Sequence, residues 1–169
     1  MKTQIRKGVF ETNSSSVHAI CIATEDEYKV FDELFFDWGE FGWEWETYDS
    51  TYERASYLWT AINNFYWRKE QAEEIEAAKN RITEVLAKHG CKAEFAEPDT
   101  SKWHKTGCID HSGELGEFLE YVLVDEEGLL SYLFSDLSFI ETGNDNDSDE
   151  DHYVNADVSY PHEEFYKGN

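Results

Sequence analysis

The chain has 169 residues, of which 37 are Asp or Glu and 14 are Lys or Arg, so its formal net charge is −23. A chain of this length fits one domain, and an aromatic content of 16% with only two prolines argues against a disordered acidic tail. Its apolar runs are about five residues long, far short of the roughly 20 that cross a bilayer, which excludes a membrane span. Its negative charge repels nucleic acid, which excludes direct binding to DNA or RNA.

The amino-terminal part of the chain predicts two strands and a helix. Residues 2–10 and 17–23 are expected to be strands, the second of them buried, with a polar loop at 11–16 between them. Thr24 with Glu27 forms a capping-box pattern, which predicts a helix over residues 25–36. The expected inner face of this helix carries Tyr28, Phe31, Leu34 and Phe35.

A strand and a long helical region follow. Rings and carboxylates alternate over residues 43–48, which predicts a strand whose acids project into solvent while its rings pack. Ser50 with Glu53 is a second capping box and starts a helix, and a second helix-prone stretch over 69–89 ends at Gly90. Together they predict a helical hairpin, or one long bent helix, around residues 51–89.

The remaining sequence completes an α+β pattern. Strands are expected at 91–97 and near 106–110, and helices near 114–124 and 126–134. Residues 143–151 are expected to be a mobile acidic loop, and 153–160 a closing strand. The order predicts a single acidic α+β domain over residues 1–169, with a mixed or antiparallel sheet covered by several helices.

The expected location is the cytoplasm. The basic amino terminus lacks an apolar stretch and a small-residue cleavage site, so it is not expected to be a secretory signal. Cys21, Cys91 and Cys108 are odd in number and widely spaced, which favours reduced thiols over a disulfide framework.

The negative charge is concentrated in two blocks. Residues 24–53, the first acidic block, carry eleven acids and one base; residues 109–169, the second acidic block, carry seventeen acids and one base. The segments 1–23 and 54–108 are nearly neutral. Repulsion is expected to hold the blocks apart unless a basic partner bridges them, and a symmetric homodimer would join them into one strip.

Three serines precede a histidine in the segment RKGVFETNSSSVH, residues 6–18. Ser14, Ser15 or Ser16 with His18 would supply a nucleophile and its base, but a third orienting group and an oxyanion hole are not evident. A loop whose hydroxyl groups bond their own backbone is the simpler interpretation. The segment resembles an amino-terminal stretch of uncharacterised phage and mobile-element proteins of Gram-positive bacteria, which implies a genomic context and no activity.

Two groups of residues have the chemistry of metal ligands without a complete metal-site pattern. The first comprises His89, Cys91, His104, Cys108 and His111, whose spacing fits no standard zinc site, so a buried thiol and surface histidines are the simpler interpretation. The second comprises Asp145, Asp147, Asp149 and Asp151, which lack the glycine and glutamate that an EF-hand needs at positions 150 and 156. No cofactor or metal is expected.

The leading hypothesis is a phage-type anti-defence inhibitor that occupies the basic nucleic-acid-binding cleft of a host protein as a DNA or RNA mimic. In charge and size the chain resembles acidic anti-restriction and anti-CRISPR inhibitors, which implies a CRISPR or restriction effector as partner. The expected partner-binding residues are Asp37, Trp38, Glu40, Trp43, Glu44, Glu46, Asp49, Glu114, Glu117, Glu120, Asp125, Glu126 and Glu127.

Two other functional classes also fit the sequence. One is a small phage enzyme that modifies a host factor, with the segment Ser14 to Ser16 and His18 near its site. A pair of carboxylates could serve such an enzyme, but spacing singles out no pair among 37 acids. The other class is an acidic structural or housekeeping protein whose charge only maintains solubility.

Overall fold

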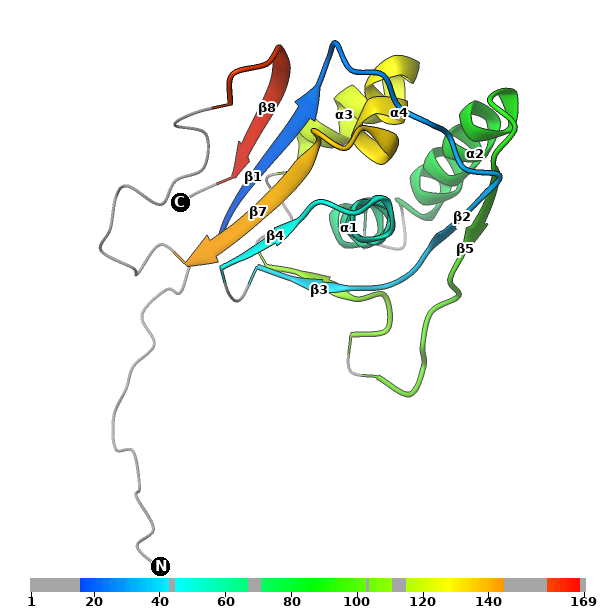
Figure 1. The fold of residues 1–169 in the computed structure, drawn as a ribbon. Coiled ribbons are helices and arrows are strands. Elements are labelled where there is room, and N and C mark those ends of the chain that lie inside the picture. Colours follow the sequence, from blue (N-terminus) through cyan, green and yellow to red (C-terminus); the bar gives the residue numbers. More distant parts are fainter. Residues whose placement is uncertain are drawn as a thin grey trace, which may run out of the picture.

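A computed structural model describes residues 16–42, 45–66, 71–102, 104–110, 115–144 and 158–167, and Figure 1 shows its fold. The described strands are β1 (Ser16–Ala23), β2 (Glu33–Phe36), β3 (Glu40–Phe41), β4 (Glu46–Tyr48), β5 (Lys92–Phe95), β6 (Cys108–Ile109), β7 (Phe139–Asn144) and β8 (His162–Lys167). The described helices are α1 (Thr51–Phe65), α2 (Ala72–Lys88), α3 (Gly116–Val124) and α4 (Glu126–Phe134). The fold is α+β, as predicted.

The main sheet has four antiparallel strands in the order β4-β7-β1-β8. Every residue of β1 is buried, which confirms the strand predicted over residues 17–23. The side chains of β1 alternate between the two faces of the sheet, and Ile20 and Ile22 enter the same core as Ile140 of β7 and the helices. Two small parallel sheets, β2 with β5 and β3 with β6, lie beside α1.

The capping box predicted at Ser50 starts α1. Ser50 Oγ accepts a hydrogen bond from the Glu53 backbone N–H, and the Glu53 carboxylate accepts from the Ser50 backbone N–H at 3.2 Å. The predicted region around 51–89 forms two helices, α1 and α2, whose connection at 67–70 lies outside the described residues. Helix α2 ends before Gly90, whose φ of +79° is a conformation that glycine adopts at little cost.

The helix predicted over residues 25–36 is wrong. Residues 24–32 contain no helix, and β2 follows them, paired in parallel with β5. Burial in β2 alternates with a period of two: Leu34 and Phe36 are buried, whereas Glu33 and Phe35 are exposed. Phe36 stacks on Phe95 at 4.7 Å between ring centroids, so pairing with a distant strand outweighs the local capping signal.

The last two strands also differ from prediction. The sequence predicts no element over residues 139–142 and a loop from Gly143, whereas strand β7 covers Phe139–Asn144. Gly143 instead lies where the Trp45 ring crosses the strand: a Cβ atom there would lie 2.3 Å from the ring, so the position has no room for a side chain. The closing strand is β8, not 153–160; residues 158–161 are not a strand, and 145–157 lie outside the described residues. The strand predicted at 2–10 lies outside them too.

No described helix combines the length and the apolar character that crossing a membrane would require. The helices predicted near 114–124 and 126–134 correspond to α3 and α4, and the strands predicted at 91–97 and 106–110 correspond to the shorter β5 and β6.

Candidate functional site

The two acidic blocks meet at a pocket of about 780 Å³, which we call the acidic pocket. It lies between residues 24–28 of the first block and the region where α3 passes into α4 in the second. Its lining is Ala23, Thr24, Glu25, Asp26, Glu27, Tyr28, Tyr121, Asp125, Glu127, Gly128 and Ser131. Because both blocks supply carboxylates to one pocket, the expectation that repulsion holds the blocks apart is wrong here.

Hydrogen bonds fix the carboxylates around the acidic pocket. The Tyr28 hydroxyl donates to Glu127 Oε2 at 3.0 Å, and the Ser135 hydroxyl donates to Asp26 Oδ2. Asp125 is the N-cap of α4 and accepts from the backbone N–H of Gly128 at 3.0 Å. Burial, with a further contribution from Glu127, raises the pKa of Tyr28 to about 12, so Tyr28 stays a neutral donor at pH 7.

Strand alternation places Glu33 and Glu40 of the first block on the surface. In β2 and β3 the apolar residues Leu34, Phe36 and Phe41 point into the core, so the intervening positions face solvent. The exposed carboxylates of this region are Asp32, Glu33, Asp37, Glu40, Glu46, Asp49 and Glu53. With Glu25, Asp26, Glu27, Asp125 and Glu127 of the pocket they form what we call the acidic face.

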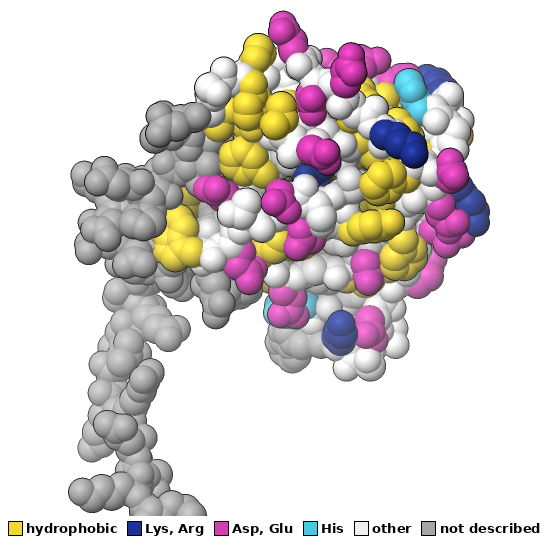
Figure 2. All heavy atoms as spheres, viewed as in Figure 1, with side chains coloured by type: hydrophobic (Ala, Val, Ile, Leu, Met, Phe, Trp, Pro, Cys, Tyr) yellow, Lys and Arg dark blue, Asp and Glu magenta, His cyan; other side chains and the backbone are white. Residues whose placement is uncertain are grey.

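The acidic face contains few cations. Lys29 is the only Lys or Arg in residues 24–53. Figure 2 shows Asp and Glu side chains spread over this side of the molecule, with hydrophobic side chains between them and few Lys or Arg. Glu40 also borders a small pocket of about 180 Å³ that Lys102 and Lys105 help to line, so these two lysines mark one boundary of the face.

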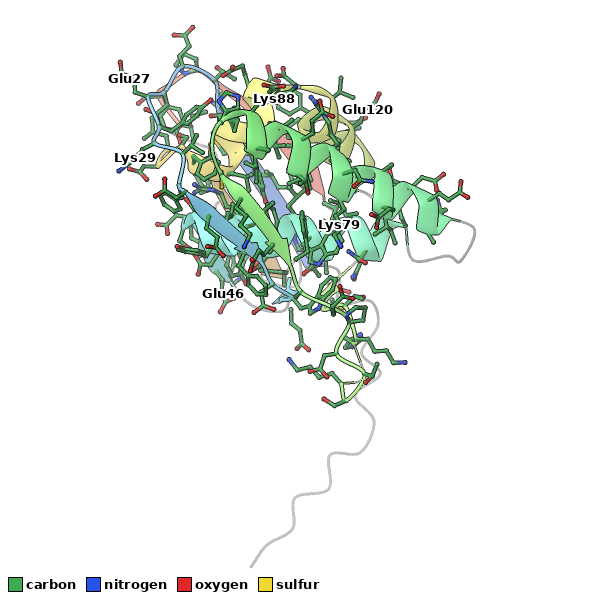
Figure 3. All side chains as sticks on the ribbon, turned by 90° about the vertical axis from the view of Figure 1, so that its right-hand side faces the viewer. Glu27, Lys29, Glu46, Lys79, Lys88 and Glu120 are labelled. Carbon is green, nitrogen blue, oxygen red and sulfur yellow. The ribbon has the colours of Figure 1, made fainter. Side chains whose placement is uncertain are left out.

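Lysines of α2 lie on another side of the molecule. Figure 3 shows Lys79 and Lys88 on the side turned to the viewer, whereas Glu27 and Glu46 lie toward its left edge. Lys88 pairs with Glu84 at 3.3 Å and with Glu126 at 3.0 Å. The charge of Lys88 is thus paired within the protein.

Glu126 has internal partners, although it was expected to bind another protein. Besides Lys88, His89 Nε2 lies 3.1 Å from its carboxylate and the Arg81 guanidinium lies 3.9 Å from it. The hydrogen bonds from Lys88 and His89 hold the pKa of Glu126 below its usual range. Glu126 therefore joins α4 to α2 and adds little negative charge to the acidic face.

The structure separates other expected partner-binding residues. Trp38 stacks on Trp59 at 5.3 Å between ring centroids and donates from Nε1 to the Glu97 carbonyl at 2.9 Å, so its ring is largely committed to packing. Glu117 and Glu120 are exposed on α3, and Figure 3 places Glu120 well away from Glu46. Trp43, Glu44 and Glu114 lie outside the described residues.

Strand β4 only partly follows the predicted alternation of rings and acids. Glu46 is exposed as expected, but Tyr48, on the same side of the strand, is buried and its hydroxyl donates to the Glu46 carboxylate. Trp45 is 39% exposed and lies over Gly143. The rings therefore pack on both sides of the strand.

A buried arginine, missed from the sequence, holds the elements of the acidic face together. Arg54 of α1 is 1% exposed, and its guanidinium donates to the backbone carbonyls of Asp49, Leu133, Ser135 and Ser138. Burial lowers the pKa of Arg54, but an arginine keeps its charge at any ordinary pH. Its only sequence signal is a charged residue among the apolar positions of an amphipathic helix.

His18 and Ser16 form a second cluster, entirely buried. Ser16 Oγ lies 3.1 Å from His18 Nε2, and the Tyr57 hydroxyl lies 2.9 Å from His18 Nδ1. Gly42 packs directly on this histidine: its φ is +108°, and a Cβ atom would lie 2.7 Å from His18 Nε2. Tyr57 is the third group that the sequence did not reveal, because it comes from α1, 39 residues away.

The directions of these hydrogen bonds differ from those of an activated serine. Ser16 donates to the Asp110 carbonyl at 3.2 Å, so its oxygen accepts from Nε2–H of His18, and Nδ1 then accepts from the Tyr57 hydroxyl. A general base would instead need to take the serine proton on Nε2. With Ser16 only 2% exposed, the arrangement favours a structural role. Ser14 and Ser15 lie outside the described residues.

Replacing Tyr57 by phenylalanine is expected to destabilise the protein by about 1–3 kcal/mol, because His18 Nδ1 would lose a buried donor. Urea unfolding followed by circular dichroism measures the change. The variant Tyr52→Phe, which removes a hydroxyl from an exposed ring of the same helix, is the matched control and should unfold like the unchanged protein. Equal midpoints for both variants would show that the His18 cluster contributes nothing to stability.

The residues with metal-ligand chemistry are not gathered into a site within the described parts of the chain, where no group of three or more His, Cys, Asp or Glu is arranged to hold a metal ion. Cys91 is buried as expected, between α2 and β5, and His89 contacts Glu126. Burial raises the pKa of the Cys21, Cys91 and Cys108 thiols, so they stay protonated at pH 7. His111 and Asp145 to Asp151 lie outside the described residues.

Comparisons of the chain with protein-family models, with curated proteins and with solved structures find no match.

Proposed function

We propose that this protein is an inhibitor that binds the basic nucleic-acid-binding cleft of another protein in place of DNA or RNA. The observation that carries the proposal is the acidic pocket, which Glu25, Asp26 and Glu27 of the first block line together with Asp125 and Glu127 of the second, about 100 residues away in the chain, while Lys29 is the only Lys or Arg in residues 24–53. A protein whose charge served only solubility would have no need to gather its carboxylates in this way.

Electrostatics defines the class of partner. Duplex DNA presents about one negative charge per 1.7 Å of its axis, and clefts that bind it are lined with Lys and Arg. A face with a dense array of carboxylates attracts such a cleft and repels nucleic acid itself. Association should therefore be fast at low salt and weaken steeply as salt rises.

Defence effectors that process nucleic acid, such as CRISPR or restriction enzymes, are the partners that fit the proposal best. The support for this narrower choice is the resemblance of residues 6–18 to phage and mobile-element proteins, together with the net charge of −23. The alternative of an enzyme acting through Ser16 and His18 has less support, because their side chains are buried and Ser16 donates its proton to a carbonyl.

Displacement by DNA tests the proposal. The protein is immobilised, exposed to a bacterial lysate at low salt, washed, and eluted with duplex DNA; a plain carboxylate resin serves as the control for simple ion exchange. We expect DNA to release proteins that the plain resin does not retain, because DNA and the inhibitor compete for one cleft. Retained proteins that leave with high salt but not with saturating DNA would contradict mimicry.

A further inference from the structure

Four aromatic rings are exposed in the described part of residues 24–53, Phe31, Phe35, Trp45 and Tyr52, and of these Phe31 and Tyr52 contact each other. Phe31 is 36% exposed and Tyr52, in the first turn of α1, is 58% exposed. Their ring centroids are 6.0 Å apart, and Phe31 also packs edge-on against the buried Phe134 at 5.6 Å. The pair, which we call the aromatic patch, thus packs on the core through Phe31 and is partly exposed to solvent.

Carboxylates flank the aromatic patch along the chain. Asp32 follows Phe31, Glu53 follows Tyr52, and Asp49 precedes Tyr52 by three residues; all three are exposed. Arg54, the nearest arginine in sequence, is buried with its guanidinium committed to backbone carbonyls, so it offers the rings no cation. Lys29 is the one exposed cation nearby in the chain.

Exposed rings beside carboxylates bind an arginine side chain better than a lysine side chain. A guanidinium is planar and weakly hydrated, so it can stack on an aromatic face while its N–H groups pair with a carboxylate. An ammonium is strongly hydrated and lacks the flat surface for stacking. Exposed rings that offer area and fixed geometry are also frequent anchors at protein interfaces.

We propose that the aromatic patch and its flanking carboxylates bind an arginine side chain of the basic partner, in preference to lysine. This inference rests on the proposed function and adds the residue type that the partner presents. A second copy of this chain is a poor occupant of the patch, because each copy carries a charge of −23 and the patch lies within the acidic face.

The test compares two peptides of equal length and charge, nona-arginine and nona-lysine, by titration calorimetry at one salt concentration. The unchanged protein is expected to bind nona-arginine more tightly. Tyr52→Ala should weaken nona-arginine binding about two- to fivefold, the range for exposed cation–π contacts, and leave nona-lysine binding within about twofold. Tyr52→Phe keeps the ring and should keep the preference.

The control variant is Val124→Ala, which removes an apolar side chain that is 74% exposed on α3, outside the patch. It should change neither affinity. Equal effects of Tyr52→Ala on both peptides, or none on either, would overturn the inference while leaving the proposed function standing. If neither peptide binds the unchanged protein, the proposed function fails as well. Sedimentation equilibrium that shows a dimer abolished by Tyr52→Ala would assign the patch to self-association and overturn the inference.

Discussion

Reversing two carboxylates of the acidic face is expected to lower affinity for the DNA-displaceable partner about 100-fold or more. The double variant Glu27→Lys with Asp49→Lys places like charges against a basic cleft at two separate points of the face, and each reversal should cost at least about tenfold. Both side chains are exposed, so the fold should persist. Titration of the purified partner at a single salt concentration measures the loss.

A control variant with the same change in net charge shows whether affinity depends on the acidic face or on the net charge of the protein. Glu73→Lys with Glu76→Lys makes the same reversal on α2, where both side chains are exposed and Lys79 lies nearby in the helix. We expect this variant to retain affinity within a few-fold, since long-range attraction falls only slightly with net charge. If both double variants lose affinity equally, the partner responds to net charge and the acidic face is not a binding surface.

Removing the buried arginine is expected to give the largest loss of stability. Arg54→Met keeps much of the side-chain volume but deletes the donors to four backbone carbonyls, of which the Ser135 carbonyl keeps the Ser138 N–H as a donor. Each buried acceptor left unpaired costs about 1–3 kcal/mol, so the loss summed over these carbonyls should be about 3 kcal/mol or more. Urea unfolding at pH 7, followed by circular dichroism, measures the free energy of unfolding.

Two further variants distinguish hydrogen bonding by Arg54 from its charge. Arg54→Lys keeps the charge but cannot present the guanidinium fork, so it should also destabilise, by more than about 1 kcal/mol. Arg81→Met removes a partly exposed arginine that donates to the Leu123 and Val124 carbonyls, and should cost about 1 kcal/mol or less. Unfolding midpoints that do not distinguish Arg54→Met from Arg81→Met would refute the role assigned to Arg54.

Local signals in the sequence predicted the elements that local interactions determine. The capping box at Ser50, the helical spacing after it and the stop at Gly90 correctly located α1 and α2. The helix predicted after Thr24 is wrong because the same apolar residues fit both the period of a helix and the period of a strand. The distant strand β5, which pairs with β2, decides between the two. The loop predicted from Gly143 is wrong at that residue for a similar reason. The Trp45 ring, which leaves no room for a side chain at position 143, is nearly 100 residues away in the chain.

Charge counting predicted the two acidic blocks but not their contact. The contact depends on the long-range packing of Phe31 on Phe134 and on Arg54, which joins α1 to the segment after α4. Residues 25–27 were counted in the first block without being expected in the site, because the helix assigned to them gave no reason to place them near Glu127. The sequence likewise could not show that Glu126 would pair with Lys88 and His89.

Carboxylate footprinting tests the central claim most directly. The protein, alone and in complex with its DNA-displaceable partner, is labelled with a carbodiimide and an amine, and labelling at each carboxylate is quantified by mass spectrometry. Contact between the acidic face and a basic cleft should protect Glu27, Asp49 and Glu53 on complex formation and leave Glu73, Glu74 and Glu76 of α2 unchanged. Protection confined to α2, with the acidic face labelled as in the isolated protein, would contradict the account.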